Sequence, residues 1–98
     1  MAAHAGQPID ELERLTAVSA LALAKACPSL VALSRETAER HRQAMAIAAD
    51  KEGPANVERQ VANMINSTRA TGCAQNAADV ASNPDRYPFL TARTARAG

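Results

Sequence analysis

Aromatic and bulky aliphatic side chains are scarce in this chain of 98 residues. Tryptophan is absent, and Tyr87 and Phe89 are the only aromatic residues. Although 47% of the residues are apolar, 24 residues are alanine, and Leu, Ile, Val and Phe together number only 16. Such a small share of bulky residues is typical of disordered chains when the net charge is also large. Because the net charge is only +1, we predict a folded chain with a thin core.

An excess of charge of one sign is also missing, since 11 basic residues stand against 10 acidic ones. Proteins that bind nucleic acid or a membrane surface usually carry a cationic excess that recruits phosphates. The charge balance therefore makes a nucleic-acid partner improbable and predicts no membrane partner.

The sequence contains none of the short motifs that indicate the common kinds of catalytic or cofactor-binding site. A glycine-rich phosphate loop, a Cys-x-x-Cys pair, a Gly-x-Ser-x-Gly elbow and a His-Glu-x-x-His run are all absent. Only two histidines are available for proton transfer. We therefore expect no catalysis by this chain alone, no metal site and no cofactor.

Signals for secretion or membrane insertion are also missing. The longest charge-free stretch near the start, residues 15–24, is much shorter than the roughly 20 residues that span a bilayer. The start lacks a cationic stretch followed by an apolar run. Two cysteines are too few for a disulfide framework. The expected location is the cytoplasm.

Alanine favours helices most strongly, and residues that favour strands are few, so we predict an all-α fold of three helices. The first helix should begin after Pro8, where acidic Asp10 and Glu11 complement the positive end of the helix dipole. It should end near Cys27, because Pro28 disfavours helical geometry in the residue before it.

Two apolar faces compete on this first helix. At 100° per residue, one broad face contains Leu12, Leu15 and Leu23, whereas Val18 and Leu21 fall toward the charged side. The helix should therefore be covered from more than one direction.

A second helix is expected from Ser29, as its N-cap, to about Glu52. Gly53 and Pro54 then punctuate the chain, because glycine suits the end of one helix and proline the first turn of the next. A third helix should run antiparallel to the second and form a central helical hairpin with it. Gly72 ends or loosens this helix, and whether the helix continues beyond it is left open.

Composition changes near residue 82, so we predict a helical domain over residues 1–82 and an extended C-terminal tail over residues 83–98. The tail holds both aromatic residues of the chain. We expect Tyr87, Phe89 and Leu90 to dock either on the helices or on a partner.

His41 lies in the middle of the apolar stripe of the second predicted helix. One interpretation makes it a metal ligand or a titrating switch. No carboxylate or histidine shares its face within a turn, since Glu36 and Glu39 project elsewhere. We therefore favour the alternative, a hydrogen-bonded histidine that fixes the register of the packed helices.

Cys27 and Cys73 leave two states open. Cys27 ends the first predicted helix and Cys73 lies late in the third, so the fold could bring them close enough for a disulfide. Spacing in the sequence cannot test the short separation that a disulfide demands.

The leading functional hypothesis is a non-catalytic helical interaction or assembly protein. Buried alanine contributes little at about 25 cal/mol per Å², so such a unit should complete its core by self-association or as an accessory subunit of a larger complex. A small nucleic-acid-binding regulator and a small-ligand or haem-binding helical protein are the alternatives. The candidate interface residues are Val18, Leu21, Leu30, His41, Met45, Val61, Met64, Tyr87, Phe89 and Leu90.

Overall fold

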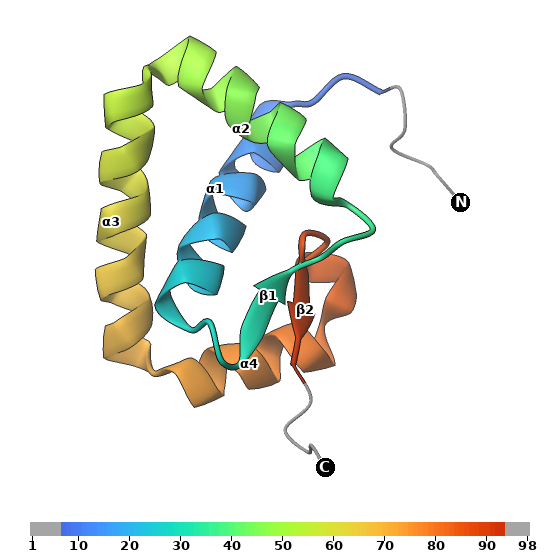
Figure 1. Ribbon diagram of the computed structural model, residues 1–98, viewed down its shortest axis with the longest axis vertical. Helices are drawn as coiled ribbons and strands as arrows, with labels where there is room; N and C mark the ends of the chain where they lie inside the picture. Colours follow the sequence, from blue (N-terminus) through green and yellow to red (C-terminus); the bar gives the residue numbers. More distant parts are fainter. Residues whose placement is uncertain (1–6, 94–98) are drawn as a thin grey trace.

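Residues 7–93 form four helices, rather than the expected three, and one small sheet. The computed structural model describes residues 7–93. Figure 1 shows the first helix and the two strands inside a frame formed by the other helices. In chain order the elements are α1 (Glu11–Ala26), β1 (Val31–Leu33), α2 (Ala38–Glu52), α3 (Pro54–Thr71), α4 (Cys73–Ser82), the 3-10 turn η1 (Pro84–Arg86) and β2 (Leu90–Ala92).

The ends of α1 follow from local chemistry. Asp10 is the N-cap, and its carboxylate accepts a hydrogen bond of 2.8 Å from the backbone amide of Glu13. At the other end, Cys27 leaves helical geometry immediately before Pro28. The first predicted helix is thereby confirmed to within a residue or two at each end.

The second predicted helix is wrong over its first third, because residues 31–33 form a strand and α2 begins only at Ala38. Strand β1 pairs with β2 in antiparallel register, with Val31 opposite Ala92 and Leu33 opposite Leu90. This pairing with a segment far along the chain supplies the backbone hydrogen bonds that a helix would otherwise have made. The predicted N-cap Ser29 therefore lies in the turn before β1.

Two glycines form the corners between the last three helices. Gly53 and Gly72 have φ of +93° and +106°, a region that residues with a side chain rarely adopt. Gly53 separates α2 from α3, as predicted. Gly72 does not merely loosen the third helix but ends it, and α4 starts in a new direction at the next residue. This second corner makes the helix count four.

The core is organised around α1 instead of a hairpin of α2 and α3. Helix α1 contributes to two buried clusters. One cluster contains Ala17, Ala20, Leu23, Cys27, Val31, Ala44, Val80, Phe89 and Leu90. The other contains Val18, Ala22, Ala48, Val57 and Val61. The predicted hairpin is therefore not central, because α1 separates much of α2 from α3.

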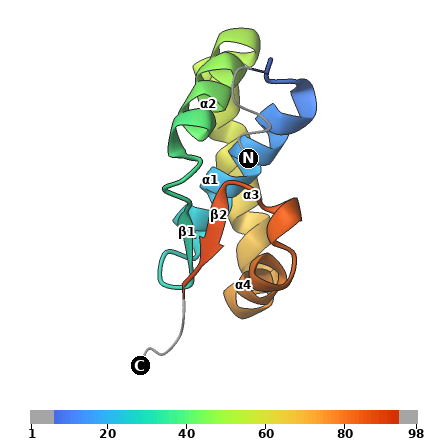
Figure 2. The same ribbon diagram turned by 90° about the vertical axis from the view of Figure 1, so that its right-hand side faces the viewer.

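The molecule is flat, with principal extents of 40 × 33 × 17 Å. Figure 2 shows the molecule turned by 90°, so that its shortest dimension lies across the view. Within residues 7–93, the large apolar side chains that remain exposed are Leu12 (72%) and Leu15 (42%). The flat frame therefore covers α1 along most of its length but leaves part of its first half open.

The C-terminal segment packs into the core, as expected from its aromatic residues. Phe89 is 2% exposed and Leu90 is 9% exposed, and both belong to the first cluster. Tyr87 is partly buried against the same cluster. Residues 83–92 thus share a core with the helices, while residues 94–98 of the predicted tail lie outside the described residues.

A disulfide joins Cys27 to Cys73, with a Cα–Cα distance of 5.6 Å. Of the two states that the sequence left open, the structure has the bonded one. The bond ties the end of α1 to the first residue of α4 and closes a loop that contains β1, α2 and α3.

Reduction of this disulfide should destabilise the fold. Cross-links across a separation of 46 residues restrict the unfolded chain and stabilise a protein by about 4 kcal/mol in the chain-entropy account. Urea unfolding followed by circular dichroism should therefore show a markedly lower midpoint with reductant. The urea midpoint of the Cys27→Ser, Cys73→Ser variant should equal that of the reduced protein and should not change when reductant is added. Two free thiols in freshly denatured, unreduced protein would contradict this.

Candidate functional site

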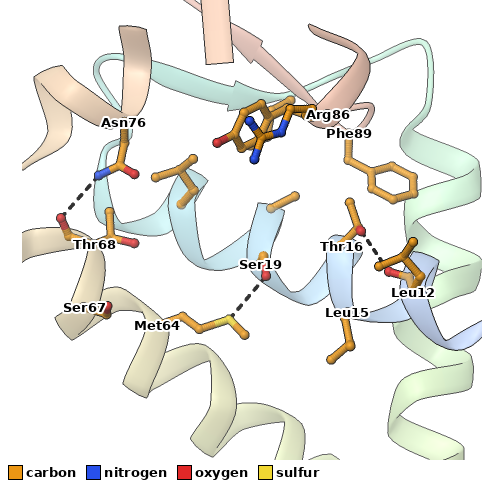
Figure 3. Close-up of a pocket in the computed structure, with 14 residues that line it drawn as sticks. Leu12, Leu15, Thr16, Ser19, Met64, Ser67, Thr68, Asn76, Arg86 and Phe89 are labelled. Atoms are coloured by element: carbon orange, nitrogen blue, oxygen red, sulfur yellow. Dashed lines mark hydrogen bonds between the residues drawn. The ribbon is translucent and has the colours of Figure 1, made fainter. Parts of the chain in front are cut away.

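An open groove of about 440 Å³ runs along the exposed side of α1 (Figure 3). Helix α1 forms its floor, α3 and the start of α4 form one side, and the segment from η1 to β2 forms the other. The lining residues are Leu12, Leu15, Thr16, Ser19, Ala20, Leu23, Met64, Ser67, Thr68, Asn76, Arg86, Tyr87, Phe89 and Leu90.

The floor of the groove is a stripe on α1 whose residues recur at intervals of three and four. Among the apolar residues of this stripe, exposure falls from 72% at Leu12 and 42% at Leu15 to 3% at Ala20 and 7% at Leu23, while Ser19 between them is exposed. The N-terminal half of the stripe therefore projects from the surface, and the C-terminal half is sunken. We call the projecting half, residues 11–15, the α1 tip.

Three polar side chains in the groove are already occupied by the chain itself. The Thr16 hydroxyl donates to the carbonyl of Leu12 at 2.8 Å, and the Ser19 hydroxyl donates to the sulfur of Met64 at 3.6 Å. The Asn76 amide donates to the carbonyl of Gly72 at 2.8 Å. Ser67, Thr68 and Tyr87 also line the groove, and within residues 7–93 their hydroxyl groups form no hydrogen bond, so the groove combines apolar surface with a few free hydroxyl groups.

Arg86 is the single charged residue in the groove lining. In Figure 3 the side chain of Arg86 extends over the groove from the side formed by the segment from η1 to β2. Among residues 7–93, no hydrogen bond or ion pair to its side chain is formed. The groove is thus apolar with one cation on its rim, and no carboxylate lines it.

No group of three or more His, Cys, Asp or Glu side chains that could hold a metal ion occurs in the part of the chain that the structure describes. No described helix is long and apolar enough to cross a membrane.

His41 is 7% exposed and lies between α2 and α1. Its Nε2 is 2.9 Å from the carbonyl of Ala17, and its ring meets the ring of Phe89 edge to face at 5.2 Å. Since a carbonyl only accepts hydrogen bonds, Nε2 must be the protonated nitrogen that donates. This geometry supports the interpretation of His41 as a structural histidine rather than a metal ligand.

Two arginines of α2 are held by glutamates. Arg40 forms a bidentate ion pair with Glu13, with distances of 2.6 and 2.7 Å, and also donates to the backbone carbonyl of Gln7. The hydrogen bonds that Arg40 donates to Glu13 raise the pKa of Arg40, and the hydrogen bonds that Arg42 donates to Glu39 lower the pKa of Glu39. Arg40 thereby anchors α2 to the start of α1, and both arginines are partly neutralised.

The structure separates the candidate interface residues into two groups. Five are buried within the chain itself: Val18, His41, Val61, Phe89 and Leu90. The other five are partly buried: Leu21, Leu30, Met45, Met64 and Tyr87. Four of the ten line the groove: Met64, Tyr87, Phe89 and Leu90.

The helical periodicity of α1 does not show which of its two apolar faces is covered. Leu12 and Leu15, on the broad apolar face, are exposed, whereas Val18, toward the charged side, is 2% exposed. The two apolar faces were visible in the helical periodicity. Which face receives α3 depends on contacts that α1 alone does not encode.

Comparison of the chain with protein-family models, curated proteins and solved structures found no match.

Truncation of His41 should destabilise the fold without affecting the groove. The His41→Ala variant loses the hydrogen bond to Ala17 and the ring contact with Phe89, so its free energy of unfolding should fall by roughly 2 kcal/mol. The exposed neighbour Gln43, changed to Ala, should alter stability by less than about 0.5 kcal/mol. Chemical denaturation measures both, and equal effects would contradict a structural role for His41.

Proposed function

We propose that this chain is a non-catalytic helical interaction protein that associates with a second copy of itself through the α1 tip and the groove. The observation that supports this most directly is the exposure of Leu12 and Leu15 beside an apolar hollow. Leu12 and Leu15 are the large apolar side chains left exposed within residues 7–93, and contiguous exposed apolar surface is typical of association sites.

The energetic reason lies in the thin core. Among residues 7–93, ten of the fourteen buried apolar residues are either alanine or valine, which bury less apolar area than leucine. Burying one leucine contributes roughly 1.5–3 kcal/mol, so covering Leu12 and Leu15 in each of two copies is a large gain for a domain of this size. Association is thus a direct way to complete the core.

A small-ligand carrier is the second candidate function. The volume of about 440 Å³ falls within the range of typical ligand pockets, and Arg86 on the rim suits an apolar molecule with an acidic group. Nucleic-acid binding has less support, because Glu13 and Glu39 hold two of the arginines on which it would depend.

We also infer that the working form is the oxidised one. Disulfides persist in oxidising compartments and are rare where thiols are kept reduced. The Cys27–Cys73 bond therefore favours an oxidising compartment over the cytoplasm expected from the sequence.

Light scattering behind size exclusion, over a dilution series, tests the association. We expect the unreduced wild-type protein to dissociate from a dimer to a monomer as it is diluted. The Leu12→Ser, Leu15→Ser variant should remain a monomer with unchanged helicity, because both residues are already exposed in the single chain. Weakening of at least tenfold is expected if each copy loses two leucine contacts.

The control variant Ala62→Ser removes an apolar group outside the groove, at an exposed position of α3. This variant should dimerise like the wild-type protein. A wild-type protein that is a fully helical monomer at millimolar concentration would contradict the proposal. A monomer that carries a bound small molecule in native mass spectrometry would support the carrier instead.

A further inference from the structure

We propose that the two copies associate by reciprocal insertion, with the α1 tip of each copy in the groove of the other and Glu11 of each facing Arg86 of the other. This inference rests on the proposed function and specifies its geometry. It concerns one symmetric pair, related by a two-fold axis that crosses α1 near Thr16 and Ser19.

The shape of α1 supports reciprocal insertion. Its groove-facing stripe carries a projecting half with Leu12 and Leu15 and a sunken half with Ala20 and Leu23. An antiparallel arrangement of two such helices sets each projecting half against the sunken half of the other copy. The same surface patch on both copies is then complementary to itself, as a two-fold interface requires.

A parallel arrangement fits the same residues poorly. It would set Leu12 against Leu12 of the second copy and would place the two sunken halves opposite each other. The hollow of about 440 Å³ would then remain unfilled, and unfilled apolar space forfeits packing contacts.

One exposed acid of the α1 tip and the one base of the groove are of opposite charge, while Arg14, the tip's own cation, is partly buried. Three acidic residues begin α1, but Asp10 caps its own helix and Glu13 binds Arg40. Glu11 is exposed and forms no hydrogen bond or ion pair through its side chain within residues 7–93. Arg86 is likewise exposed and is the groove's one charged residue. Opposite charges at the two ends of one interface fix its register and orientation.

Charge reversal with mixing tests this geometry. The Glu11→Arg variant places two cations together at both symmetric contacts, and the Arg86→Glu variant places two anions together. Each variant alone should therefore dimerise about tenfold more weakly than wild type. In an equimolar mixture, every contact in the mixed pair again joins an arginine to a glutamate. The mixture should recover association to within about threefold of wild type.

Matched controls carry the same changes of charge elsewhere. Glu58→Arg and Arg59→Glu alter exposed residues of α3 that do not line the groove. Each should dimerise like wild type, and mixing the two should change nothing. Sedimentation velocity at one fixed salt concentration measures all these mixtures, and circular dichroism checks that each variant is folded.

The outcomes separate the geometry from the association itself. If the leucine variant abolishes the dimer but the mixture of charge variants fails to recover, the association stands and the reciprocal geometry is overturned. If wild type never dimerises, both fall. If single reversals weaken the dimer and their mixture restores it, the α1 tip and the groove are the two halves of one interface.

Discussion

The packing of α1 is the constraint on which the rest of the structure depends. One side of this helix supports the cluster that holds Phe89 and Leu90, and another side supports the cluster with Val57 and Val61. Small alanines on α1 allow its neighbours to approach closely, but they bury little area. The groove opens where these neighbours leave the first half of the helix exposed at Leu12 and Leu15.

Two long-range connections hold this frame around α1. The disulfide fastens α4 to the end of α1, and the pairing of β1 with β2 fastens the C-terminal segment beside it. Together they position Arg86 and Phe89, which come from the last part of the chain, along the wall of a groove whose floor comes from the first helix. The candidate site therefore exists only in the complete fold.

The sequence predicted those features that are encoded locally. The start of α1 follows from the Asp10 cap, and the corner between α2 and α3 follows from Gly53. The strand at Val31–Leu33 was not predictable, because its hydrogen-bonding partner lies near the far end of the chain. The groove was missed for the same reason, since the periodicity of α1 shows two apolar faces and tertiary contacts decide that Val18 is covered and Leu12 is not.

An open apolar groove, one cation on its rim and a projecting leucine pair are the observations on which the proposed association rests. The most direct measurement is a nuclear Overhauser experiment on a mixed sample in which only half of the chains carry isotope labels, so that signals between copies are selected. The account predicts cross-peaks between the methyl groups of Leu12 or Leu15 in one copy and those of Ala20 or Leu23 in the other. A dimer that lacks these cross-peaks, or a sample with no signals between copies at millimolar concentration, would contradict it.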